Sequence, residues 1–104
     1  MVDLWKYYKE EDWIYLLSNT IPLALNENKK HLEYVSSLNI FPDDICKVLA
    51  VYYDYMFEGK DENFQNWLVK KQSLLDNETP ISLMKLPNGV LGLKVYLLRY
   101  PLLL

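Results

Sequence analysis

Residue types on which many catalytic and metal sites depend are scarce in this 104-residue chain, which has one histidine, one cysteine and three glycines. Structural zinc sites take four nitrogen or sulfur ligands, so His31 and Cys46 do not supply one, and we predict no metal site. A single cysteine forms no internal disulfide, which favours a reducing cytosol. The glycines, at positions 59, 89 and 92, match no common phosphate-binding loop.

Positive charge and long apolar runs are also scarce. The chain carries 11 Lys and Arg against 14 Asp and Glu, a net charge of −3, and the acidic excess lies in residues 1–52. Nonspecific nucleic-acid binding requires a basic surface, so this balance argues against DNA binding. No apolar run approaches the roughly 20 residues of a membrane-spanning helix. The first residues also lack the basic and then apolar pattern of a secretion signal. We therefore expect a cytoplasmic protein that does not contact a membrane.

Patterns typical of helices occur along the whole sequence. The chain is 51% apolar and 14% aromatic, which is enough for one modest core. Apolar residues recur at helical spacing, and the alternation typical of strands is absent. We predict an all-α protein: a single compact domain over residues 1–104 with about five or six short helices. Within it we distinguish an N-terminal helical region, residues 1–44, to which we assign no role, from residues 45–104, which carry the motifs described below.

Proline, acidic residues and glycine mark the expected helix ends. Pro42 with the acids after it fits a first helical turn, and Thr79-Pro80 repeats a cap-then-proline signal. Gly59 is expected to end a helix in the left-handed conformation. The predicted helices span residues 3–17, about 26–37, 42–58, 61–68, a short segment from 79, and 88–99. The first of them is predicted to turn one apolar side inward, formed by Leu4, Tyr7, Tyr8, Ile14 and Leu17.

Residues 34–48 have the residue pattern of a helix-turn-helix. Asn39 occupies the turn position, and asparagine tolerates the left-handed backbone conformation that this position needs. A DNA-recognition helix approaches phosphates, but this second helix begins with Asp43 and Asp44, which phosphates would repel. We favour a plain corner between two helices. A DNA-binding autoregulator is the alternative for this segment.

No catalytic group is predicted, and we expect a protein without enzymatic activity or cofactor. Cys46 lies in an apolar helix beside acidic residues that disfavour the thiolate, so we place it in the core. Acid pairs at helix starts are explained by the helix dipole. The nine tyrosines suit either the edge of a core or an interface with a partner. The apolar tail, residues 98–104, suits packing on the chain's own core, on a second copy or on a partner.

The order of motifs between Phe64 and Tyr100 is more specific than a helix pattern. A Trp-Leu pair closes one helix, a Leu-containing loop follows, Thr-Pro starts a short helix, and a Gly opens a last helix that ends in Leu-Arg-Tyr. This order resembles the C-terminal toxin-binding domain of the MbcA/ParS/Xre antitoxin family. The residues that carry the resemblance are Trp67, Leu68, Leu75, Thr79, Pro80, Leu83, Gly89, Val95, Leu98, Arg99 and Tyr100.

The resemblance implies a non-catalytic antitoxin that binds a partner toxin enzyme. In that family the partner is a RES-type enzyme that consumes NAD, and the C-terminal end of the antitoxin covers the entrance to its active site. The resemblance implies that Arg99 and Tyr100 lie nearest the partner, with Gly89 opening the helix that supports them. We also predict that Trp67, Leu102 and Leu103 bind the partner. The alternative is a small phage or mobile-element interaction module that acts by protein–protein binding or homodimerisation, without binding DNA.

Overall fold

The computed structural model describes residues 4–99, and over this range the all-α prediction is confirmed. The described residues form no strand, and Gln72 and Glu78 make one isolated bridge. The N-terminal half contains η1 (Leu4–Tyr7), α1 (Glu10–Tyr15), η2 (Leu16–Thr20), α2 (Ile21–Leu25), η3 (Asn26–Asn28) and α3 (Lys29–Ser37). The remainder contains α4 (Asp43–Val51), α5 (Tyr53–Phe57), α6 (Asp61–Val69), η4 (Ser73–Leu75), α7 (Pro80–Leu83) and α8 (Gly89–Arg99).

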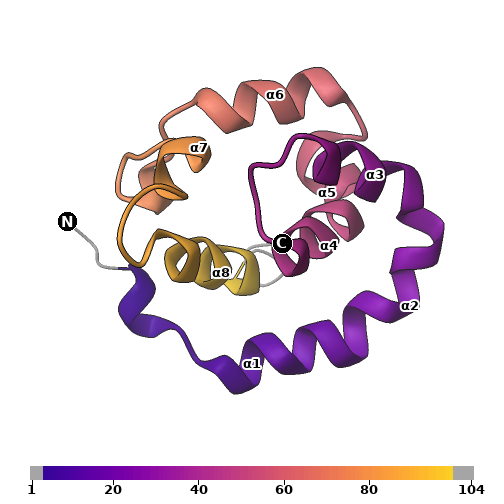
Figure 1. Ribbon diagram of the computed structural model, residues 1–104, viewed down its shortest axis with the longest axis horizontal. Coiled ribbons are helices and arrows are strands. Elements are labelled where there is room, and N and C mark those ends of the chain that lie inside the picture. The colour runs from indigo at the N-terminus through magenta and orange to yellow at the C-terminus, as the bar shows by residue number, and fades with distance from the viewer. Residues whose placement is uncertain (1–3, 100–104) are drawn as a thin grey trace.

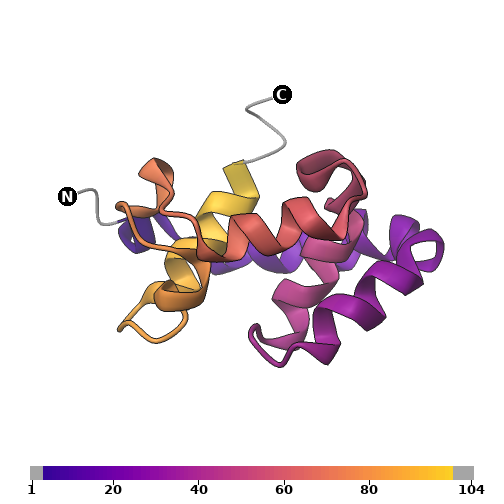
Figure 2. The ribbon, with the colours of Figure 1, turned by 90° about the horizontal axis from the view of Figure 1, so that it is seen from above.

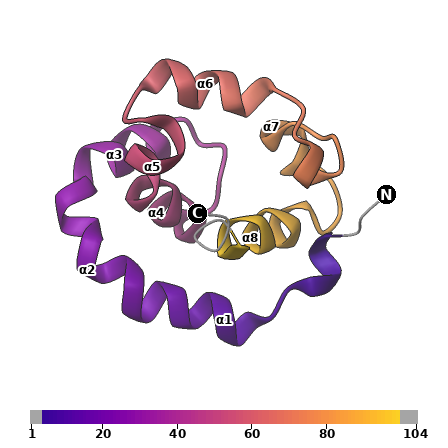
Figure 3. The same cartoon turned by 180° about the vertical axis from the view of Figure 1, so that it is seen from behind.

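The helices are arranged around a central core. Figures 1 and 3 show the helical run from α1 to α3 curving along one side, α6 and α7 on the opposite side, and α4 and α8 between them. Figure 2 shows α8 crossing the short dimension of the molecule, so its two ends lie toward opposite faces. Over residues 4–99, no helix has both the length and the apolar character needed to cross a membrane.

One hydrophobic cluster extends through the described chain, from Leu4 to Leu97. Helices from both halves contribute side chains that are completely buried, among them Val35, Ile45, Leu49, Tyr53, Phe64, Leu93 and Leu97. Three phenylalanines of this region, Phe41, Phe57 and Phe64, also surround the Trp67 ring. Buried area of this kind is the main source of stability in a chain of this size.

Several local signals form the structures that were predicted from them. Thr79 caps α7 because its side chain accepts a hydrogen bond from the Ser82 amide while the Ser82 hydroxyl accepts one from the Thr79 amide. Asn39, between α3 and α4, has a φ of 55° and turns the chain at the predicted corner. Gly59 has a φ of 69° after α5, and Glu58 before it is also left-handed.

The predicted first helix, residues 3–17, is wrong in its extent and in part of its inward face. Leu4 is buried, and Tyr8 and Leu17 pack partly buried against the core, as expected. The described part is split into η1 and α1, and Lys9 between them is extended. Tyr7 and Ile14, which we expected inside, are 60% and 52% exposed, whereas Trp13 is 2% exposed. The following segment, η2, is a π-helix, which inserts a residue into the helical repeat and shifts the buried face.

The predicted single helix over residues 42–58 is also divided. Tyr52 leaves the helical conformation with φ −90° and ψ 5°, and it separates α4 from α5. Both helices are nevertheless buried on the same core through Leu49 and Phe57. The break changes the direction of the chain while the apolar residues still face inward.

A polar cluster ties the N-terminal helices to α8. The Trp13 indole N–H donates to Asp44 Oδ2 at 2.9 Å, and Lys94 Nζ lies 3.2 Å from the same oxygen. The Lys94 ammonium also lies 5.3 Å from the centre of the Trp13 ring and 5.6 Å from that of Tyr8. These contacts fix the positions of α1, α4 and α8 relative to one another. The short helix η1 packs alongside α8.

Candidate partner-binding site

Arg99 ends α8 as an exposed residue, and its guanidinium lies over the Tyr7 ring at 5.0 Å from the centre. Among the described residues, no carboxylate lies within ion-pair distance of this guanidinium. Arginine binds carboxylates and phosphates through paired hydrogen bonds, and stacking on a ring limits the conformations it samples beforehand. Arg99 is therefore partly ordered and open to a partner. Tyr100, Leu102 and Leu103, which we also predicted to bind the partner, lie outside the described residues.

Gly89 is buried at the start of α8, and the packing of the chain requires a glycine there. A Cβ atom at this position would lie 1.7 Å from the Leu83 carbonyl oxygen, well inside van der Waals contact. Its φ is not in the left-handed region, so the reason is close approach between α8 and the backbone of α7 and not backbone conformation. Gly89 also lines a pocket, described below.

Trp67 lies in α6, away from both ends of α8. Its ring centre is 5.2 Å from that of Phe57 and 6.3 Å from that of Phe41, so it packs at the edge of the aromatic core. Its indole N–H is buried and has no hydrogen-bond acceptor among residues 4–99. The residue also borders an open hollow with polar side chains on α6, among them Asn63 and Asn66.

The described members of the predicted set therefore do not gather in one cluster. Gly89 and Arg99 are at opposite ends of α8, about 15 Å apart by helical rise. Trp67 belongs to a different helix and contacts the phenylalanine rings. Because the two ends of α8 lie toward opposite faces of the molecule, these three residues do not form one contact surface.

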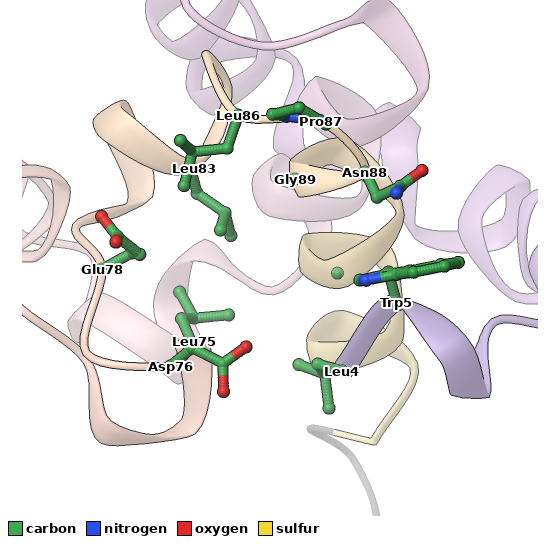
Figure 4. Close-up of a pocket in the computed structure, with 11 residues that line it drawn as sticks. Leu4, Trp5, Leu75, Asp76, Glu78, Leu83, Leu86, Pro87, Asn88 and Gly89 are labelled. Atoms are coloured by element: carbon green, nitrogen blue, oxygen red, sulfur yellow. The ribbon is translucent and has the colours of Figure 1, made fainter. Parts of the chain in front are cut away.

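A pocket opens where η1, η4 and the loop between α7 and α8 meet, and Figure 4 shows it. Its volume is about 140 Å³. Leu75 and Leu83 lie on one side, and Leu4 and Trp5 lie opposite. Leu75, Leu83 and Gly89, which all carry the family resemblance, thus border one pocket although they come from three different elements.

The pocket is apolar inside and acidic at its border. Trp5 and Leu86 are 38% and 42% exposed at its rim. Asp76 and Glu78 also line it, and its lining includes no Lys, Arg or His. Glu78 Oε2 accepts a hydrogen bond from the Ser82 hydroxyl at 3.2 Å, which is a neutral partner. The site is suited to an apolar group that is accompanied by positive charge.

The pocket could not be predicted from the sequence, because the exposed residues that line it do not recur at helical spacing. Trp5 lies in the segment that we treated as part of a regular helix, and Leu86 lies in a loop. A tryptophan outside the predicted inward face was the available clue, since tryptophan is frequent at interface hot spots.

The other polar side chains with possible chemistry take structural contacts. His31 Nε2 is 3.0 Å from Asp54 Oδ1, and the His31 ring stacks on Tyr53 with centres 4.3 Å apart. Cys46 is buried, and burial raises the pKa of its thiol. Within the described range, no group of three His, Cys, Asp or Glu side chains is placed to hold a metal ion.

Comparison with known proteins gives no match: no family model, no curated protein and no solved structure matches the chain. The resemblance to the antitoxin family therefore stays a prediction from its motifs.

Proposed function

We propose that this protein is a non-catalytic, antitoxin-like domain that binds a partner toxin enzyme of the RES type and occludes its NAD-consuming site. The observation that carries the proposal is the exposed guanidinium of Arg99, held over the Tyr7 ring at the end of α8. A guanidinium pairs bidentately with acidic groups, so Arg99 suits carboxylates at the entrance of a partner site. Arginine and tyrosine are also enriched at hot spots of protein interfaces.

The stacked arrangement favours binding for an energetic reason. A free arginine side chain loses conformational entropy when a partner immobilises it, roughly 0.5–1.5 kcal/mol. Tyr7 restricts Arg99 before the partner arrives, so less of that entropy remains to be lost. The residues that follow Arg99 in the sequence, Tyr100 to Leu104, are apolar apart from the tyrosine hydroxyl.

The test pairs the chain with a RES-domain enzyme encoded beside its gene and follows NAD consumption. We expect the intact chain to suppress consumption, and Arg99→Ala or deletion of residues 99–104 to abolish suppression while the helical circular dichroism is kept. Lys47→Ala is the matched control, because it removes an exposed positive charge from α4. Full NAD consumption in the presence of excess intact chain, or equal suppression by Arg99→Ala, would refute the proposal.

A second candidate, a self-associating interaction module, is favoured by another surface. Leu23 is 84% exposed on α2, and Ile14 and Tyr15 on α1 are 52% and 66% exposed. Exposed apolar groups of this size are typical of interfaces when they form a contiguous patch. Sedimentation velocity at decreasing concentration distinguishes the two functions, since a protein that stays monomeric at all concentrations excludes the module that acts by dimerisation.

A further inference from the structure

We propose that the pocket between η1, η4 and the α7–α8 loop binds one apolar side chain, of leucine or phenylalanine size, from a partner segment that carries a Lys or Arg beside it. The inference rests on the proposed function in one respect, namely that the partner is a protein. It concerns the end of α8 opposite to Arg99, so it adds a second point of contact.

The volume of the pocket sets the size of its occupant. At about 140 Å³ it is close to the apolar cavity of about 150 Å³ that accepts benzene in another protein. Sites for cofactors and drug-sized molecules are larger, about 300–1,000 Å³. A single phenyl ring or branched aliphatic side chain fits this space, as at interface hot spots where one anchor residue fills a pocket.

Gly92 keeps one wall of the pocket open. A Cβ atom there would have the Trp5 amide nitrogen, at 3.9 Å, as its nearest neighbour, so packing does not demand a glycine at this position. Glycine inside a helix nevertheless destabilises it by about 1 kcal/mol relative to alanine. The glycine therefore lowers helix stability, and the absence of a side chain there leaves room in the pocket for a side chain from outside.

The charges at the rim identify the second feature of the partner. The Glu78 carboxylate accepts a hydrogen bond from the neutral Ser82 hydroxyl, and it pairs with no positively charged side chain among the described residues. Asp76 adds a second carboxylate to the lining. The whole chain is also acidic, with a net charge of −3. A Lys or Arg next to the apolar anchor gains attraction here, and an acidic residue is repelled.

Nuclear magnetic resonance with selective labelling tests the proposal directly, because the chain has three glycines and three tryptophans. Gly89, Gly92 and Trp5 line the pocket, while Gly59, Trp13 and Trp67 lie elsewhere and report nonspecific effects. The probe is the hexapeptide Ser-Gly-Phe-Lys-Gly-Ser. Two further peptides replace its Phe by Ala or its Lys by Glu.

We expect the Phe-Lys peptide to shift the amide signals of Gly89 and Gly92 and the indole signal of Trp5, with Gly59 unchanged. Replacing Phe by Ala should weaken binding by about tenfold or more, since burial of the ring is lost. Replacing Lys by Glu should weaken it by at least about two- to fivefold, the range for an exposed ion pair. Glu78→Gln should cause a similar loss, and Glu62→Gln, an exposed carboxylate on α6, should cause none.

The variant Gly92→Leu should block the pocket with its own side chain. If this variant does not fold, Gly92→Ala serves instead and should fill part of the pocket. Binding of the Phe-Lys peptide should be lost or reduced accordingly. Shifts that are equal at Gly59, that persist in the blocked variant, or that fail to appear at Gly89 and Gly92 would overturn the proposal. Shifts at Gly92 that follow protein concentration without peptide would assign the pocket to a second copy and overturn it as well.

The two proposals fail separately. The peptides contain no enzyme, so absence of peptide binding removes the pocket proposal and leaves the NAD assay to decide the toxin proposal. Peptide binding combined with uninhibited NAD consumption would support the pocket proposal and refute the toxin proposal.

Discussion

Lys94 Nζ lies 3.2 Å from a carboxylate oxygen of Asp44, so the last helix is paired with the first turn of α4. The same carboxylate accepts the indole N–H of Trp13. Residues 13, 44 and 94 thus meet at one point although Asp44 is 31 positions from Trp13 and 50 positions from Lys94 in sequence. This contact holds η1 and α1 against α8, and the pocket and Tyr7 depend on that arrangement.

Asp44→Ala should destabilise the protein by about 2 kcal/mol, measured as the free energy of unfolding in urea. It leaves the Trp13 N–H without its acceptor and Lys94 without its counter-charge. The loss should stay below that of a fully buried pair, because the Asp44 and Lys94 side chains are 31% and 15% exposed. Asp43→Ala, at the neighbouring exposed position, is the control and should lose less than about 1 kcal/mol. Equal losses would show that only helix-dipole effects operate.

The same pair predicts how stability depends on pH. Burial acts to raise the pKa of Asp44, but hydrogen bonds from Trp13 and Lys94 and the charge of Lys94 outweigh it, so the pKa lies below its ordinary value. A lowered pKa in the folded state gives stability that is present above the unfolded pKa, about 3.9, and is lost as pH falls through the folded pKa. The advantage of the native protein over Asp44→Asn should be constant above about pH 5 and shrink below about pH 4. A difference that persists undiminished in strong acid would contradict this.

The two glycines of α8 should respond in opposite ways to alanine. Gly89→Ala places a methyl group against the Leu83 carbonyl and should destabilise by about 3 kcal/mol, because helix and loop must move apart. Gly92→Ala makes only an ordinary van der Waals contact, with the Trp5 amide nitrogen at 3.9 Å, and should leave stability unchanged or raise it by up to about 1 kcal/mol. Thermal unfolding followed by circular dichroism measures both. Similar melting temperatures for the two variants would show that the contact at Gly89 relaxes freely.

Local sequence signals predicted those parts of the fold that depend on neighbouring residues. The cap at Thr79, the corner at Asn39 and the end of a helix at Gly59 each need only a few adjacent side chains, and all three are present. The apolar pattern likewise predicted an all-α class, since helical spacing is repeated along the chain. These features follow from backbone preferences that tertiary packing did not override.

Features that depend on distant residues could not be predicted in this way. We explained Asp44 by the helix dipole alone, and its partners Trp13 and Lys94 are known only once the helices are placed. The extended residue Lys9 breaks the helical repeat between η1 and α1, which made our inward set wrong at Ile14. The pocket brings together Leu4, Leu75 and Gly89 from separate elements, and no local spacing encodes that meeting.

Tyr53 provides a prediction at alkaline pH. Its hydroxyl donates to Asp61 Oδ1 at 2.5 Å, and its ring is buried. Burial raises the pKa of Tyr53, and the hydrogen bond to the Asp61 carboxylate and the charge of that carboxylate raise it further. A pKa raised in the folded state gives stability that is present below the unfolded value, about 10, and is lost as pH rises above it.

Tyr53→Phe should therefore lose about 1 kcal/mol near neutral pH, through the missing hydrogen bond, and should lose less stability than the native protein as pH rises above about 10. The free energy of unfolding in urea, measured from pH 7 upward, gives both quantities. Burial also raises the pKa values of Tyr8 and Tyr52, but these residues are present in both proteins, so the difference isolates Tyr53. Tyr55→Phe, at a ring that is 65% exposed, should follow the native curve. Parallel curves for native protein and Tyr53→Phe would mean that the Tyr53–Asp61 contact does not control proton release.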